Sequence, residues 1–227
     1  MAQLIENYAM LGDLHTAALV GIDGSIDWLC LPRFDSPSTF GALLGDPDHG
    51  RWLVAPTASL DRDSELRATR AYRDHTFVLV TRWITPTGEV EVTDLMPLGD
   101  DRADVIRRVT GISGRVEMHV DLRIRFGYAG ALPWIRQVNE GSADSHDRAL
   151  IAVAGPDAII VRGPALTADG QSHKGDFTVA AGETVDLTLT WFRAHRDLAV
   201  AGPGPCQPGS QRPHVPSDAR VRGPRRS

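Results

Sequence analysis

Cysteine, lysine and aromatic residues are scarce in this sequence of 227 residues, and it contains no long apolar run. The two cysteines, Cys30 and Cys206, are too few for a disulfide framework or a zinc-binding spacing. No apolar stretch approaches the roughly 20 residues that a membrane helix needs. The N-terminus has no basic region followed by an apolar stretch, which is the pattern of a secretory signal. We therefore expect a cytoplasmic protein that spans no membrane.

Charge is unevenly distributed along the chain. The formal net charge is −5, and residues 200–227 contain five arginines against one acidic residue, so this segment carries +4 and the remainder −9. An acidic main domain argues against nucleic-acid binding. From Val200 onward, 10 of 28 positions are proline or glycine and no periodicity remains. We expect residues 199–227 to form a disordered tail.

Alternation with a period of two residues is the main pattern before the tail. Its clearest example runs from Val116 to Phe126, where apolar residues at even positions alternate with charged residues at odd positions. Val185–Trp191 repeats the pattern. A strand with one apolar and one charged face belongs to an antiparallel sheet that is covered on one side only.

Turn residues separate the predicted strands. Asp23-Gly24 predicts a two-residue hairpin turn that places Leu19 opposite Trp28 and Gly21 opposite Ile26. The other predicted turns are Thr85-Pro86-Thr87-Gly88, Ile112-Ser113-Gly114, Gly155-Pro156-Asp157 and Ala181-Gly182-Glu183. About ten strands result, with the spacing of a sandwich.

One short helix is predicted after Ser36-Pro37, which fit its N-cap and first position, and it would end at Gly45. The sequence thus predicts an all-β fold: an antiparallel β-sandwich over residues 1–198, with one short helix, followed by the tail at 199–227.

No strong catalytic or metal-binding motif is present. Asp46, Asp48 and His49 could be drawn as a metal cluster, and so could Asp144, His146 and Asp147. We interpret both groups as turn or surface residues, because adjacent loop residues seldom converge on one ion. Asp13 and His15 fit a local hydrogen bond better than a catalytic pair. We expect no metal and no cofactor.

Four residues are candidates for contact with a substrate. A glycosidase needs two carboxyl groups on either side of the bond that it cleaves. Asp27 and Asp35 are the acids least easily explained by a turn or an exposed strand face. Arg33 and Asp35 could bind a ligand, although a bracing role in their loop is favoured. Trp134 follows Leu132-Pro133, and an aromatic side chain exposed there could stack on a sugar ring.

Several segments together resemble a known module. They are Ile5–Asp13, Thr16–Val20, Asp23–Trp28, Pro32–Pro37, Gly50–Trp52, Thr81–Trp83, Gly88–Pro97, Arg107–Gly111, Arg125–Tyr128 and Leu187–Trp191. Over residues 4–196 the chain resembles the N-terminal trehalase-like domain of glycoside hydrolase family 15. The resemblance implies a β-sandwich that precedes an (α/α)₆ barrel in enzymes that hydrolyse trehalose or α-glucans with inversion.

The resemblance also implies that no catalytic residue lies in this chain, because the family carries both catalytic glutamates in the barrel. The barrel would then be the missing partner, and an α-glucoside the ligand. The tail has the composition of an out-of-frame read in a GC-rich gene, so a truncated or frameshifted product is one interpretation. The alternative is a free-standing carbohydrate-binding or interaction module.

Overall fold

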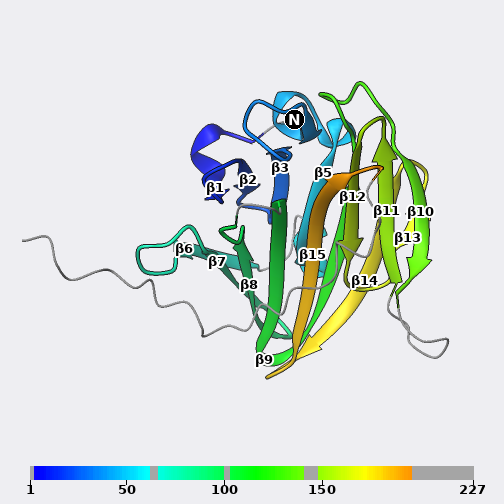
Figure 1. The fold of residues 1–227 in the computed structure, drawn as a ribbon. Helices are drawn as coiled ribbons and strands as arrows, with labels where there is room; N and C mark the ends of the chain where they lie inside the picture. Colours follow the sequence, from blue (N-terminus) through cyan, green and yellow to red (C-terminus); the bar gives the residue numbers. More distant parts are fainter. Residues whose placement is uncertain (1–2, 62–65, 100–102, 141–147, 196–227) are drawn as a thin grey trace, which may run out of the picture.

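The computed structural model describes residues 3–61, 66–99, 103–140 and 148–195. These residues form fifteen strands, all paired antiparallel, and four short 3₁₀ turns (Figure 1). None of the described helices is long and apolar enough to cross a membrane. The all-β fold class is confirmed. The predicted tail at 199–227 and the group Asp144, His146 and Asp147 lie outside the described residues.

The first sheet, called sheet A, has the order β1-β2-β3-β5-β9-β14-β13, and β4 also pairs with β3. Only the second half of β9 belongs to it. Its strands are β1 (Tyr8–Gly12), β2 (Ala17–Gly21), β3 (Ser25–Cys30), β4 (Ser38–Phe40), β5 (Arg51–Pro56), β9 (Ala103–Arg123), β13 (Thr167–Asp169) and β14 (Ser172–Ala180).

The second sheet, called sheet B, has the order β6-β7-β8-β9-β15-β12-β11-β10 and contains the first half of β9. Its remaining strands are β6 (Arg67–Tyr72), β7 (Leu79–Thr85), β8 (Gly88–Leu95), β10 (Trp134–Asn139), β11 (Arg148–Ala154), β12 (Asp157–Arg162) and β15 (Thr184–Arg193).

The long strand β9 joins the two sheets. The turn predicted at Ile112-Ser113-Gly114 is a bend within this strand, where the chain passes from sheet B into sheet A. Gly114 has a φ of 63° there. The turn at Ala181–Glu183 lies beside the bend, because Gly182 N donates to Gly111 O over 2.9 Å. We call this end of the sandwich the corner; β9, β14 and β15 converge on it at the bottom of Figure 1.

One hydrophobic core lies between the sheets. All six residues of the predicted apolar face from Val116 to Phe126 are buried in it, which confirms that face. Trp52 and Trp83 are buried as well, whereas Trp28 and Trp191 are only partly buried. A small second cluster of Ala149, Ile151 and Ile160 lies on the other face of β11 and β12.

A buried ion pair links the sheets through this core. Arg107 on β9 donates from Nε to Asp94 Oδ1 over 2.8 Å and from Nη2 to Asp94 Oδ2 over 3.2 Å. It also donates to the carbonyl oxygens of Trp52 on β5 (2.6 Å) and of Gly24 in the loop between β2 and β3 (2.7 Å), both on the sheet A side of the core. Its guanidinium lies 5.4 Å from the centre of the Trp52 ring. The exposed fractions of the Arg107 and Asp94 side chains are 0% and 1%.

The charged face predicted for residues 117–125 differs from the structure at two positions. Asp121 is buried and accepts a hydrogen bond from Arg51 Nη2 over 2.8 Å. Arg125 is buried and donates to the backbone and side chain of Gln171. The prediction of a face open to solvent was therefore wrong here, because segments outside the alternating run cover it.

The predicted turns at 85–88, 155–157 and 181–183 join β7 to β8, β11 to β12 and β14 to β15, as expected. The hairpin at Asp23-Gly24 forms, but its register differs. Leu19 pairs with Trp28 as predicted, whereas Ile26 pairs with Val20 and not with Gly21, since a bulge intervenes. Among loop residues 22–24, only Gly24 has a positive φ, whereas a type I′ turn needs two such residues. The connection is therefore a three-residue loop and not the expected type I′ turn.

The predicted helix after Ser36-Pro37 was wrong in most of its length. Residues Ser38–Phe40 form strand β4, and helical structure is limited to the 3₁₀ turn Ala42–Leu44, with Gly45 as its C-cap. Pairing with β3 satisfies the backbone of β4, so tertiary contacts override the local helix signal. The other 3₁₀ turns are Ile5–Asn7, Pro47–His49 and Thr57–Leu60.

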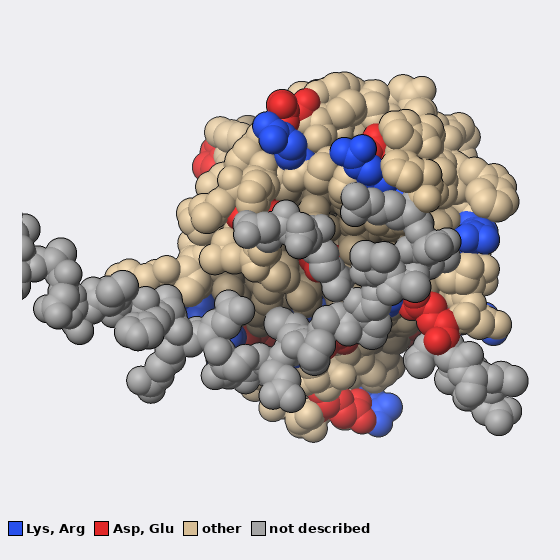
Figure 2. Space-filling view, viewed as in Figure 1, with Lys and Arg blue, Asp and Glu red and all other residues tan. Residues whose placement is uncertain are grey.

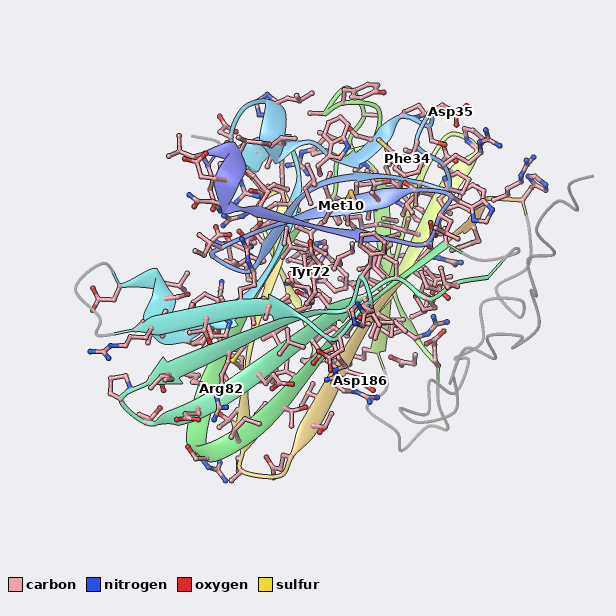
Figure 3. The ribbon with its side chains drawn as sticks, turned by 90° about the vertical axis from the view of Figure 1, so that its left-hand side faces the viewer. Met10, Phe34, Asp35, Tyr72, Arg82 and Asp186 are labelled. Carbon is pink, nitrogen blue, oxygen red and sulfur yellow. The ribbon has the colours of Figure 1, made fainter. Side chains whose placement is uncertain are left out.

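Side chains of β6 also hold the edge of sheet A. The hydroxyl of Tyr72 accepts from Met10 N over 2.8 Å and donates to Met10 O over 3.0 Å (Figure 3). Arg70 donates to the carbonyl oxygens of Val20 and Asn7, both over 3.0 Å. The two Tyr72 bonds satisfy backbone groups of β1 that an open sheet edge would expose, and the Arg70 bonds tie β6 to β2 and to the turn before β1.

Candidate functional site

The loops opposite the corner form one end of the sandwich, which we call the loop end. It comprises the loops 13–16, 31–37, 41–50 and 124–133. Strand register places them together, because β3 ends, β5 begins and β9 ends on this side of sheet A. The sequence candidates Arg33 and Asp35 lie on it, and so does Trp134 at the start of β10.

The first two loops are fixed to each other by hydrogen bonds. Asp13 is buried, and its Oδ1 accepts from the backbone N–H groups of His15 (2.9 Å) and Thr16 (2.7 Å). Phe34 N donates to His15 O over 3.0 Å. The local hydrogen bond expected between Asp13 and His15 is thus made to the backbone of His15. It helps to fix the loop that carries Leu14, which has a φ of 76°.

Arg33 and Asp35 form an exposed ion pair. Arg33 Nε donates to Asp35 Oδ1 over 2.9 Å, and their side chains are 69% and 74% exposed. The hydrogen bond from Arg33 holds the pKa of Asp35 below its usual value. Asp35 is therefore ionised near neutral pH and cannot donate a proton there. Figure 3 shows Phe34 and Asp35 near the upper edge of the molecule.

The loop after β9 contains three consecutive residues with left-handed backbones. Gly127, Tyr128 and Ala129 have φ values of 62°, 58° and 65°. Ser38 holds them, since its carbonyl accepts from Gly127 N over 2.9 Å and its hydroxyl accepts from Tyr128 N over 3.1 Å. The Tyr128 ring lies 6.0 Å from that of Trp28. Left-handed non-glycine residues are strained, and such strain clusters at functional positions.

The loop at 41–50 contains the first group that could be drawn as a metal cluster. Asp46 instead caps the 3₁₀ turn Pro47–His49 by accepting from Asp48 N over 2.8 Å, and Asp48 pairs with Arg123. Within the described residues, no group of three or more His, Cys, Asp or Glu side chains could hold a metal ion.

Asp27 lies within strand β3, and not in the loop that contains Arg33 and Asp35. It is 7% exposed, and its carboxylate oxygens accept from the hydroxyls of Tyr8 (2.7 Å) and Ser25 (2.6 Å). Burial raises the pKa of Asp27, while these two hydrogen bonds oppose the rise. Both carboxylate oxygens of Asp27 thus already accept hydrogen bonds within the domain.

Trp134 is 67% exposed, so the exposure expected for it is confirmed. It lies in one cross-strand row with Val153, Ala158 and Phe192. Of the four sequence candidates, the structure brings only Arg33 and Asp35 into direct contact. Sequence reasoning missed the exposed Leu14 and Tyr128, which a search for charged or metal-binding residues could not find.

Charged groups of both signs lie interspersed on the face shown in Figure 2. Some oppositely charged side chains are paired across strands, as Arg108 on β9 is with Asp186 on β15 (2.7 Å). A cleft between the sheets, beside Trp52, Gln137 and Leu187, has a volume of about 10 Å³. This is room for one water molecule and far too little for a sugar ring.

The fold defines a two-sheet antiparallel β domain, and comparison with known proteins places it more narrowly. Residues 1–181 match the family described as trehalase-like, N-terminal. The chain belongs to this family. It is 27% identical over 215 residues to a trehalase of Mycobacterium tuberculosis, a match that covers 83% of this chain and 30% of the relative.

Two further relatives match over shorter stretches. A trehalase of Mycolicibacterium smegmatis is 32% identical over 143 residues, which cover 55% of this chain and 20% of the relative. Trehalase 1 of Sulfolobus acidocaldarius is 35% identical over 133 residues, which cover 58% of this chain and 21% of the relative. The chain thus spans less than a third of the length of the relatives that it matches.

Proposed function

We propose that this chain is the non-catalytic N-terminal domain of a glycoside hydrolase family 15 enzyme, one that hydrolyses the α-glucosidic bonds of trehalose or of an α-glucan. The observation that carries the proposal is the match to an N-terminal family over residues 1–181, in relatives more than three times longer than the matched part. The cytosolic location expected from the sequence belongs to the same proposal.

The environment of the two candidate carboxyl groups supports a non-catalytic role. Inverting hydrolysis needs one protonated and one ionised carboxyl group about 6.5–9.5 Å apart across an accessible bond. Asp27 is buried with both oxygens hydrogen-bonded, and Asp35 is ionised beside Arg33. Neither is arranged to protonate a leaving group.

The partner in this proposal is a catalytic (α/α)₆ barrel supplied by another polypeptide segment, and the ligand of the assembly is an α-glucoside. Glucose release from trehalose and maltose by the purified 227-residue chain tests the proposal. We expect none above a buffer blank. Release that disappears in Asp27→Asn or Asp35→Asn would contradict the proposal and place an active site on β3 or the loop after it.

A second candidate function is a carbohydrate-binding module. The exposed aromatic side chains of Trp134 (67%), Phe34 (63%) and Tyr128 (55%) favour it, because aromatic rings can stack on sugars. Titration of the chain with maltooligosaccharides, followed by tryptophan fluorescence, tests this function. Saturable binding that Trp134→Ala abolishes would support it, and an unchanged signal would count against it.

A further inference from the structure

Large exposed apolar side chains gather at the loop end. Leu14 is 78% exposed, Leu44 66%, Phe34 63% and Tyr128 55%. Leu132 (59%) and Trp134 (67%) follow on the same end, between the loop after β9 and strand β10. Exposed apolar residues scattered singly are ordinary, whereas several on one surface mark a site of association.

The backbone beneath these side chains is already ordered. Phe34 is tied to the neighbouring loop through His15 O, and Tyr128 is tied to Ser38. Leu14 and Tyr128 have left-handed backbones, and both side chains are exposed. A surface whose loops are fixed before binding loses little conformational entropy when a partner packs on it. The Arg33–Asp35 pair beside Phe34 supplies polar groups at its rim.

The position of the last strand, β15, bears on which partner packs on these loops. Strand β15 ends on this side, since Phe192 shares a cross-strand row with Trp134 and Ala194 N donates to Pro156 O over 2.9 Å. Figure 1 shows β15 rising from the corner to the opposite end. In the trehalases, the region similar to this chain is at most about 30% of the protein. A polypeptide that continues from β15 starts beside the exposed loops.

We propose that the loop end is the surface on which the catalytic portion of a trehalase packs, with Leu14, Phe34 and Tyr128 as its central apolar contacts. This inference rests on the proposed function, since it names the surface through which the domain meets its partner. The partner is a folded domain that presents a complementary apolar surface. Buried aromatic side chains at the centre of such an interface supply a large share of its binding energy.

The test is co-expression of the tagged 227-residue chain with the portion of the M. smegmatis trehalase that lies outside its similarity to this chain. The loop variant is Leu14→Asn/Phe34→Ser/Tyr128→Asn, in which asparagine tolerates the left-handed backbone. The control variant is Ile84→Thr/Ile112→Thr, which alters two exposed apolar residues near the corner (42% and 40% exposed). Equal urea midpoints for the three chains establish that each is folded.

We expect the unmodified chain and the control variant to co-purify equal amounts of the catalytic portion. The loop variant should retain at least about tenfold less. Hydrogen exchange on the complex gives a reading without substitutions: the amides of 13–16, 33–36 and 127–130 should be protected by binding.

The two levels of the proposal fail differently. If the unmodified chain and the loop variant capture equal amounts of the catalytic portion, and the three loops gain no protection, the loop end is not the binding surface. The proposed function would still stand. Failure of the unmodified chain to capture the catalytic portion at all would contradict the proposed function, and this inference with it.

Discussion

Replacement of Arg107 by methionine should destabilise the domain more than a comparable change on the surface. Methionine keeps much of the apolar stem of arginine but removes every hydrogen bond of the guanidinium. Asp94 would then be a buried carboxylate without its bidentate partner, and the carbonyl oxygens of Gly24 and Trp52 would lose their donor.

The magnitude follows from burial. Removal of one partner from a buried ion pair costs about 3–5 kcal/mol, because the other charge remains uncompensated. The two carbonyl groups add to this cost if no water reaches them. We therefore expect a loss of at least about 4 kcal/mol in the free energy of unfolding. With a urea m-value of about 2 kcal/mol/M, the midpoint should fall by about 2 M.

The neighbouring residue gives a matched control. Arg108 lies on the same strand but faces outward, where it binds Asp186 on the surface. Arg108→Met should cost about 1 kcal/mol or less, as is usual for exposed ion pairs. Urea titrations followed by tryptophan fluorescence compare the two variants. Equal losses, or a loss below about 1 kcal/mol for Arg107→Met, would refute the view that Arg107 holds the two sheets together.

Three further predictions concern stability. Burial raises the pKa of Asp27, so the folded state binds more protons than the unfolded chain, and the contribution of Asp27 to stability should fall as the pH rises above about 4. Urea titrations across a pH series should show that Asp27→Asn weakens this fall, and an unchanged slope would contradict the prediction. Burial lowers the pKa of His173, so stability should fall as the pH drops below about 6.5, and a pH series with His173→Gln that keeps the same slope would contradict this. Gly114 and Gly155 have φ values of 63° and 61°, but a Cβ at Gly114 would lie 2.2 Å from Thr87 O, whereas one at Gly155 meets nothing within 4 Å. Alanine at Gly155 should cost about 1–2 kcal/mol and alanine at Gly114 at least about 3 kcal/mol by urea unfolding, and equal costs would argue against a tight bend at Gly114.

The alternation of side chains was sufficient to predict much of the fold. The apolar residues from Val116 to Phe126 face the core because a period of two residues puts them on one side of a strand. Turns built from proline and glycine were also predictable, since their residues specify the backbone locally. The bend within β9 was not, because Gly114 is equally suited to a hairpin turn and to a change of sheet.

Long-range contacts decided the features that sequence reasoning missed. Arg107 and Arg108 are adjacent and chemically identical, and only their register against Asp94 and Asp186 determines which of them is buried. The strand at Ser38–Phe40 likewise depends on pairing with β3. Substrate contacts by Asp27, Arg33, Asp35 and Trp134 stay predictions, because they depend on a ligand or a second domain rather than on this chain alone.

Trehalose hydrolysis by a reconstituted pair tests the central claim most directly. Glucose release should be measured for the 227-residue chain alone, for the catalytic portion of the M. smegmatis trehalase alone, and for the two co-expressed. If the chain is a non-catalytic domain that completes the enzyme, it releases no glucose alone, and the co-expressed pair is more active than the catalytic portion by itself. Glucose release by the chain alone, or equal activity of the catalytic portion with and without it, would contradict the account.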